Sequence, residues 1–105
     1  MRESITTEIF SIIHMRYADT DFNVASLSDA LHVDKSTLFR KCKRYFKQSP
    51  HEIIESYRMK KAIELLQVED IRVKEVAYDI GFDSYEYFSK KFKNYYGICP
   101  SAVRA

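Results

Sequence analysis

The chain has 105 residues, of which 46% are hydrophobic and 30% are charged, a composition typical of one small globular domain or of two very small ones that share a helix. It holds only two glycines and two prolines, which argues against a β-sandwich or barrel, and its apolar runs are too short to span a membrane. The formal net charge of +2 identifies no partner by itself. The N-terminal sequence gives no export signal, so we expect a cytoplasmic protein.

Two helices are predicted at the start of the chain. Isoleucines recur at helical spacing over residues 5–17, which favours an N-terminal helix there. A short helix is expected next, because Val24, Leu27 and Leu31 fall on one face of it. Asn23 is a suitable N-cap for this second helix.

A longer helix is predicted over residues 35–46, directly after a tight turn. Asp34 is placed to cap its first turn. The residues predicted to face inward from this helix are Leu38, Cys42 and Tyr45 or Phe46. Cys42 is expected to act as a small buried hydrophobe rather than as a redox group.

The middle of the chain carries the strongest helix-start signal. Ser49 can cap, Pro50 suits the first helical position, and the Glu52 side chain can reach back to the capping residue. The apolar face that follows consists of Ile53, Ile54, Tyr57, Ala62, Leu65 and Leu66. A helix over residues 50–68 would span roughly 28 Å and could act as a rigid linker.

The last third of the chain again predicts a short helix, a turn and a long helix. The short helix is indicated by Val73, Val76, Ala77 and Ile80. Gly81 stands in the turn, where a positive φ is often required, and Gly97 is a natural end for the long helix. Asp83 and Glu86 have the spacing of a capping box. The inward residues of this helix are predicted to be Phe88, Phe92 and Tyr95 or Tyr96, and a brief helical turn is expected after Pro100.

These segments are two copies of one unit. At an offset of 50 residues, the matching residues are Lys41, Lys43, Tyr45 and Pro50 with Lys91, Lys93, Tyr95 and Pro100. Upstream the offset is 49, where Val24 and Asp34 match Val73 and Asp83. One extra residue just before the second long helix explains the change. A short helix, a turn and a longer helix are the layout of a helix-turn-helix, whose second helix enters the DNA major groove.

Basic residues are concentrated on the two longer helices. From Lys35 to Pro50 there are six basic residues and no acidic one, and the second long helix carries Lys90, Lys91 and Lys93. The acidic residues gather elsewhere, notably at Glu69, Asp70, Glu75 and Asp79. This asymmetry predicts a positive face on a nearly neutral protein, which is typical of a surface that binds DNA phosphates.

From about residue 10 to residue 104, the sequence resembles the AraC/XylS family of bacterial transcription regulators. VKEVAYDIGFDSYEYFSKKFKNYYGICPSAVR (73–104) is similar to the family signature of a short helix, a Gly-Phe turn, an aromatic-rich recognition helix, then Gly and Pro. KSTLFRKCKRYFKQSPHEIIESYRMKKAIELL (35–66) is similar to the first recognition helix and the linker helix. The resemblance implies an all-α fold of about seven helices, with two helix-turn-helix (homeodomain-like) subdomains at 1–48 and 69–105 and a linker helix at 49–68.

Five positions depart from the family pattern. They are Ser28 in place of alanine, His32 and Lys47 in place of glycine, Cys42 in place of a larger apolar residue, and Arg72 as a poor helix cap. Four of the five fall in the first half of the chain. None of them removes the basic outward face of the long helices.

The family pattern also implies which residues meet DNA. Base contacts are expected from Ser36, Phe39 and Arg40 in the first recognition helix and from Ser84, Tyr85, Glu86, Ser89 and Lys90 in the second. Phosphate contacts are expected from Lys35, Thr37, Lys41, Lys43, Lys91 and Lys93. Arg40 is the strongest candidate, because a guanidinium can bind guanine O6 and N7 bidentately. Glu86 can either accept a hydrogen bond from cytosine N4 or close the start of its helix.

The resemblance implies a bacterial transcription regulator that binds double-stranded DNA sequence-specifically, with two recognition helices in successive major-groove segments. The alternative is a helical protein-interaction module on the same scaffold, without specific DNA binding. Neither an enzyme nor a cofactor or metal site is expected, because the sequence lacks a phosphate-binding glycine loop, a nucleophile–base pattern and metal-ligand spacing. We further expect RNA polymerase as a partner, a monomeric domain, any dimerisation through a domain outside this chain, and a role as the C-terminal output domain of a two-component response regulator or hybrid sensor.

Overall fold

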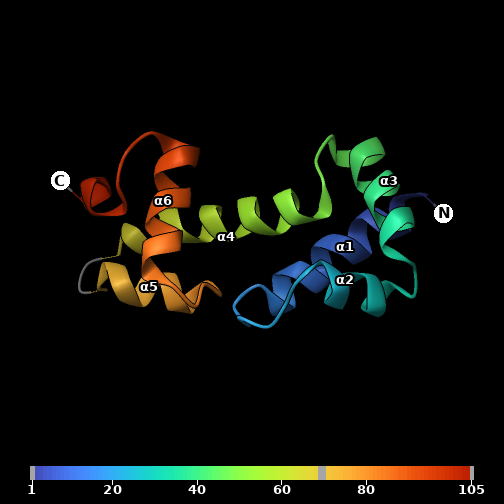
Figure 1. Ribbon diagram of the computed structural model, residues 1–105, viewed down its shortest axis with the longest axis horizontal. Helices are drawn as coiled ribbons and strands as arrows, with labels where there is room; N and C mark the ends of the chain where they lie inside the picture. Colours follow the sequence, from blue (N-terminus) through green and yellow to red (C-terminus); the bar gives the residue numbers. More distant parts are fainter. Residues whose placement is uncertain (1, 69–70, 105) are drawn as a thin grey trace.

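The computed structural model describes residues 2–68 and 71–104, and every regular element within that part is helical. The α-helices are α1 (Arg2–Arg16), α2 (Val24–Leu31), α3 (Lys35–Phe46), α4 (Pro50–Leu66), α5 (Val73–Asp79) and α6 (Tyr85–Tyr96), and the 3-10 helix η1 (Pro100–Arg104) follows them. The predicted all-α fold, with two helix-turn-helix units joined by a long helix, is confirmed. The molecule measures 45 × 23 × 21 Å, and α4 runs along it from one unit to the other (Figure 1). Glu69 and Asp70, two of the acidic residues noted in the sequence, lie outside the described residues. The predicted domain boundary at 68/69 lies at the edge of them.

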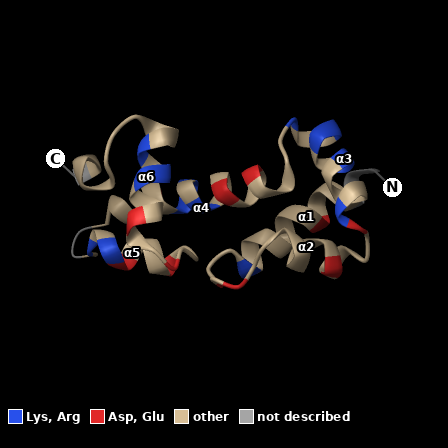
Figure 2. Ribbon diagram, viewed as in Figure 1, with Lys and Arg blue, Asp and Glu red and all other residues tan. Residues whose placement is uncertain are grey.

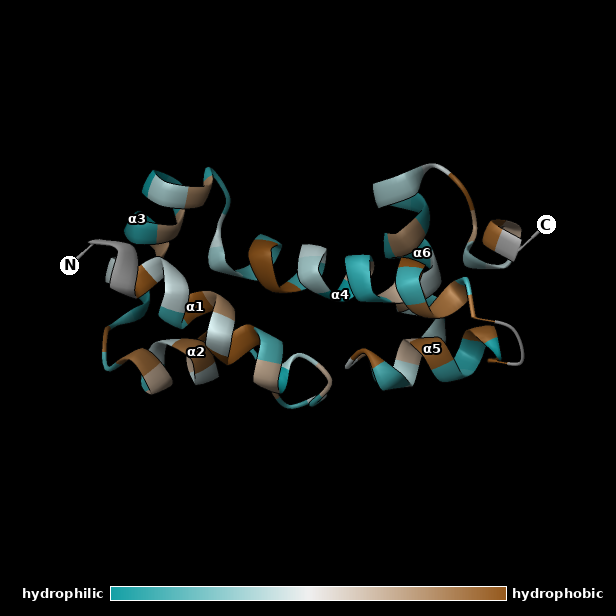
Figure 3. Cartoon of the chain, turned by 180° about the vertical axis from the view of Figure 1, so that it is seen from behind, coloured by the Kyte–Doolittle hydropathy of each residue, from teal (hydrophilic) through white to brown (hydrophobic). Residues whose placement is uncertain are grey.

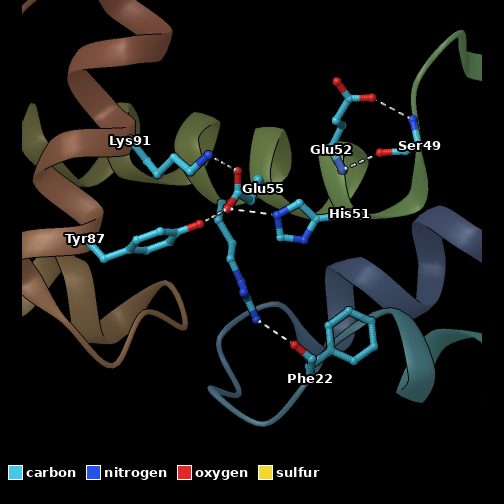
Figure 4. Close-up of polar contacts among 8 residues, drawn as sticks. Phe22, Ser49, His51, Glu52, Glu55, Tyr87 and Lys91 are labelled. Atoms are coloured by element: carbon cyan, nitrogen blue, oxygen red, sulfur yellow. Dashed lines mark hydrogen bonds and ion pairs between the residues drawn. The ribbon is translucent and has the colours of Figure 1, made fainter.

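Side-chain caps start the helices of the first half where they were predicted. The Asn23 and Asp34 side chains accept hydrogen bonds from the third residue of α2 and α3, at 2.9 and 2.7 Å. Ser49 and Glu52 form the predicted capping box: the Glu52 backbone N–H donates to Ser49 Oγ at 3.2 Å, and the Ser49 N–H donates to Glu52 Oε1 at 2.8 Å (Figure 4). Each cap contributes about 1 kcal/mol. Arg72, the poor cap, makes no side-chain hydrogen bond to the start of α5.

The start of α6 differs from the prediction. The capping residue is Ser84, whose Oγ accepts a hydrogen bond from the Tyr87 backbone N–H at 3.2 Å. The predicted capping box of Asp83 with Glu86 is therefore wrong, and Glu86 Oε1 instead accepts a hydrogen bond from Ser84 Oγ at 3.4 Å. The two capping residues, Asp34 and Ser84, correspond to each other, so the match of Asp34 with Asp83 made from the sequence is wrong and Asp83 is the extra residue of the second copy. It lengthens the turn, so that Ser84 takes the role that Asp34 has in the first copy.

Left-handed residues end several helices. His32 and Lys47, the two substitutions at glycine positions of the family pattern, keep the backbone conformation of a glycine, with φ of 59° and 62°. Gly81 and Gly97 have φ of 98° and 77°, as their places in the sequence predicted. The turn geometry is thus retained in the first unit although its glycines are replaced.

Two apolar cores form, one in each half of the chain, and α4 contributes to both. Hydrophobic residues, brown in Figure 3, occur on helices of both halves and on α4. The buried residues of the first are Ile9, Ile13, Phe22, Leu27, Leu38, Cys42, Ile53 and Ile54. Those of the second are Met59, Ala62, Leu66, Val76, Ala77, Ile80, Phe82, Phe88 and Phe92. The linker helix is therefore packed into both cores and does not connect them as a flexible segment would.

Two details of the cores bear on the predictions. Cys42 is buried as expected, and burial raises the pKa of its thiol to about 11. Tyr95 and Tyr96, predicted to face inward, are not buried and remain 40% and 41% exposed, although the Tyr96 ring packs on the buried Phe92 with the ring centres 4.8 Å apart. Phe92 is the last buried residue of α6.

A buried arginine attaches the first unit to the middle of α4. The Arg58 guanidinium donates to the backbone carbonyls of Tyr17, Asp19 and Phe22 at 2.9, 3.1 and 3.2 Å, in the segment between α1 and α2 (Figure 4 shows the Phe22 bond). Burial lowers the pKa of Arg58 from its usual value, while the carboxylates of Glu55 and Asp19 raise it. The carbonyls satisfy a charged group that would be costly to bury alone.

The turn of the second unit approaches the same place. A Cβ atom at Gly81 would lie 2.2 Å from the Tyr17 carbonyl oxygen and 2.8 Å from Arg58 Nε. Only a residue without a side chain fits between these atoms, and the positive φ imposes the same requirement. Gly81 thus allows the turn of the second unit to pack against the backbone of the first unit at Tyr17.

Gly81→Ala is expected to lower the free energy of unfolding by about 2–5 kcal/mol, because the methyl group strains a left-handed backbone and overlaps the Tyr17 carbonyl. Gly97→Ala is the matched control: its φ is also positive, but nothing lies within 4 Å of an added Cβ. It should lose only about 1–2 kcal/mol. Urea unfolding followed by circular dichroism measures both variants. Equal losses would contradict a special role for the close approach.

Candidate nucleic-acid interface

The second helices of the two units are presented together. α3 and α6 stand at opposite ends of α4, on the same side of it, and run in roughly the same direction (Figure 1). Both helices carry lysine or arginine residues, which are blue in Figure 2. The fold therefore offers two parallel basic helices at a separation that a single rigid helix sets.

On α3, the structure brings the predicted base-facing residues together. Leu38 and Cys42 point into the core, and Ser36, Phe39 and Arg40 are exposed on the outer side. With Lys35, these three residues line one open surface hollow of about 420 Å³. A guanidinium, an ammonium, a hydroxyl and an aromatic ring thus share one accessible face.

Weak contacts hold the polar side chains of this face. Arg40 Nη2 donates to Thr37 Oγ1 at 3.2 Å, one turn earlier on the same helix. Lys43 Nζ lies 5.8 Å from the centre of the Phe39 ring and 4.0 Å from Glu52 Oε1. Both members of the Lys43–Glu52 pair are about half exposed, and such pairs contribute little stability. These cations can therefore exchange their present partners for a nucleic acid.

The predicted residues of α6 are less uniformly accessible. Glu86 and Lys90 are exposed, one turn apart on the same face, and Lys93 is also exposed. Ser84 is half-buried and caps the helix. The half-buried Tyr85 packs on the second core, with its ring 6.5 Å from that of Phe88. Two further residues of α6 are half-buried, Ser89 and Lys91. The same holds for two predicted contact residues of α3, Thr37 and Lys41.

A polar cluster centred on Glu55 lies beside α6 and was not predicted from the sequence. Glu55 is only 5% exposed, and its carboxylate accepts a hydrogen bond from the Tyr87 hydroxyl at 2.9 Å (Figure 4). Lys91 Nζ lies 3.7 Å from its Oε1, and His51 Nε2 lies 3.2 Å from its Oε2. Partial burial, and then the bond to Glu55, raise the pKa of Tyr87 above its usual value.

A signal for this cluster is present in the sequence. Glu55 occupies the helical register that buries Met59, Ala62 and Leu66, four, seven and eleven residues further on. An acid in the buried register of a helix must find donors on a neighbouring element. The apolar pattern shows where the acid lies, but the identity of the donors depends on how α6 packs.

Within the described part of the chain, no helix has the length and hydropathy to cross a membrane. Nor do the histidine, cysteine and acidic side chains described there form a group that could hold a metal ion. The basic outer faces of α3 and α6 are the candidate site.

Comparisons with known proteins agree on one family. A family model described as "Helix-turn-helix domain" matches residues 27–105. The C-terminal domain of the two-component response regulator yesN from Fusobacterium nucleatum superposes with a TM-score of 0.93, at 31% identity over 97% of this chain and 99% of that one. The DNA-binding domain of AdpA, solved with a target DNA, has the same fold, with a TM-score of 0.87 at 24% identity over 93% of this chain and 87% of that one.

Longer relatives contain only a part that corresponds to this chain. "Histidine kinase P4" from Formosa agariphila is 34% identical over 99 residues, which is 94% of this chain and 7% of that protein. Across the curated relatives, the chain spans between 7% and 36% of their length. Its sequence, its helix order and its two matching units place the chain in the AraC-type helix-turn-helix family, the DNA-binding domains of bacterial transcription regulators.

Proposed function

We propose that this domain binds double-stranded DNA sequence-specifically, with α3 and α6 in successive major-groove segments of one asymmetric site. The observation that carries the proposal is the parallel placement of two exposed basic helices on one side of α4 (Figures 1 and 2). The complex of the AdpA domain with a target DNA supports it, because that domain has the same fold.

The length of α4 bears on the shape of the bound DNA. Its 17 residues rise about 25 Å, whereas successive major-groove segments on one face of B-DNA are about 34 Å apart. Reading both segments at once then favours DNA bent toward the protein. Bending by tens of degrees costs about 1–6 kcal/mol, and flexible base steps would lower that cost and add specificity.

We assign base contacts to the outer faces of α3 and α6 and to the start of α6, where some of the assigned residues are exposed and others half-buried. Arg40 leads, with Ser36 and Phe39 beside it in the same hollow. On α6, the residues assigned to bases are Glu86, Ser89 and Lys90, together with Ser84 and Tyr85 at the helix start. Phosphate contacts are assigned to Lys35, Thr37, Lys41, Lys43 and Lys93. A phosphate contact by Lys91 would have to compete with Glu55, which already holds its ammonium.

We also propose that the domain is the output end of a larger regulator, of the two-component response-regulator or hybrid-sensor type. The relatives support this, since one is an isolated C-terminal domain of a response regulator and another is a histidine kinase of much greater length. In such a protein the domain itself would be monomeric and would act in the cytoplasm. Dimerisation would use another domain, and bound RNA polymerase would be the downstream partner.

Selection of bound sequences from a random duplex pool, followed by salt titration, tests the proposal against the interaction-module alternative. DNA binding predicts an enriched site with two half-sites about one helical turn apart and a steep loss of affinity with salt. A module that binds only proteins would enrich no sequence and show no salt slope.

Arg40→Ala is expected to weaken binding to the selected site about ten- to a hundredfold more than binding to random duplex, because one bidentate base contact is lost. Arg40→Lys is the matched control, since it keeps the charge without the two-pronged geometry. It should retain random binding and still lose most of the preference for the selected site. Fluorescence anisotropy gives both affinities. Equal losses on both DNAs would exclude base reading by Arg40.

Lys43→Ala should instead weaken binding to all sequences and reduce the slope of log K against log salt by about one unit, the effect of one lost phosphate contact. Lys61→Ala serves as the control, because Lys61 lies outside the recognition helices and its ammonium is 5.6 Å from the centre of the Tyr57 ring. That variant should keep the wild-type slope. An unchanged slope for Lys43→Ala would place this residue away from the DNA backbone.

A further inference from the structure

We propose that Glu55 of the linker helix is a positioning residue. By holding Tyr87 and Lys91, it fixes the rotation of α6 about its own axis and so sets which position of the second half-site the domain accepts. The inference rests on the proposed DNA binding but goes beyond it, because Glu55 lies on neither recognition helix.

The contacts of Glu55 bridge two elements. Tyr87 and Lys91 come from successive turns of α6 and approach the carboxylate at 2.9 and 3.7 Å, and His51 approaches from α4 itself (Figure 4). The Glu55 side chain is only 7% exposed. A carboxylate with so little contact with water depends on protein donors, so a shift of α6 that separates it from them is unfavourable.

The faces of α6 explain how this contact controls rotation. Neighbouring residues on a helix differ by about 100°, so α6 carries three adjacent stripes. Phe88 and Phe92 are buried in the core, and Glu86 and Lys90 are exposed. The stripe between them consists of Tyr87 and Lys91, which face Glu55. With the middle stripe held, the direction of the exposed stripe is fixed as well.

A polar contact adds something that the core lacks. Apolar burial is not directional, so it fixes the rotation of a helix less sharply than a hydrogen bond does. A hydrogen bond from the Tyr87 hydroxyl to a nearly buried carboxylate is directional and weakens steeply when its geometry changes. The contact with Glu55 therefore limits the rotation that the Phe88 and Phe92 packing permits.

The contact of Glu55 with Tyr87 and Lys91 involves the second unit. By the internal repeat, Thr37 and Lys41 of α3 correspond to Tyr87 and Lys91, but Thr37 Oγ1 accepts a hydrogen bond from Arg40 of its own helix. Three residues after Glu55, Arg58 holds the segment between α1 and α2. One turn of α4 thus fixes α6 on one side and the first unit on the other. Loss of Glu55 should act on the second half-site and leave the first in place.

The experiment compares the selected DNA site with versions in which the second half-site is moved by one base pair. The variants are Glu55→Gln and Tyr87→Phe, and the control is Glu64→Gln, an exposed acid of α4 paired with Lys61. Wild type and control should bind the shifted sites about tenfold more weakly, a difference of about 1.4 kcal/mol. The two test variants should show less than about threefold discrimination while DNase protection of the first half-site persists, because only α6 is released.

Each outcome decides a different claim. If wild type binds no DNA site, the proposed function itself fails. If wild type discriminates and both test variants discriminate equally well, the positioning role of Glu55 is wrong. Thermal unfolding reports any general loss of stability, and if Glu55→Gln does not fold, Tyr87→Phe decides alone, because it removes a single oxygen atom from a residue that is 44% exposed.

Discussion

Everything in this domain depends on one helix serving two hydrophobic cores. α4 gives Ile53 and Ile54 to the first core and Met59, Ala62 and Leu66 to the second. Neither unit can bury its apolar residues without its half of α4, so the cores cannot move apart as domains on a flexible linker do. The distance between α3 and α6 is consequently a property of helix geometry, about 1.5 Å per residue, and is fixed before any ligand is met.

Apolar burial sets this distance, but the mutual orientation of the units depends on polar contacts. Arg58 binds three carbonyls of the first unit, and Gly81 lets the turn of the second unit reach the same carbonyl of Tyr17. Glu55 binds the side of α6 that lies between its buried and exposed faces. Two opposite charges, one helical turn apart in a linker, thus connect it to both units. Burying a charged group is unfavourable unless partners compensate it, and here the partners come from the two units packed on either side of α4.

Sequence patterns predicted the features that local chemistry determines. Caps such as Asp34 and Ser49 were identified because the residue and its hydrogen-bond partner are three positions apart. The start of α6 was misplaced because Asp83 and Ser84 are both good caps, and the choice between them depends on the length of the turn. The exposure of Tyr95 likewise depends on where the core ends, which helical periodicity does not show. Glu55 was missed since its donors on α6 are 32 and 36 residues away.

The two recognition helices differ in what they contribute, although they arise from one repeated unit. α3 carries the denser positive charge, and its Arg40 and Lys43 have only weak, exposed partners, so this helix can gain most from phosphates and bases. α6 carries an acid, Glu86, on its outer face, and Lys91 is already held by Glu55. Its electrostatic attraction to DNA is therefore smaller, and its fixed rotation matters more. In the proposed complex, α3 would supply the larger share of affinity, and α6 would discriminate among sites through the direction in which its outer face is held.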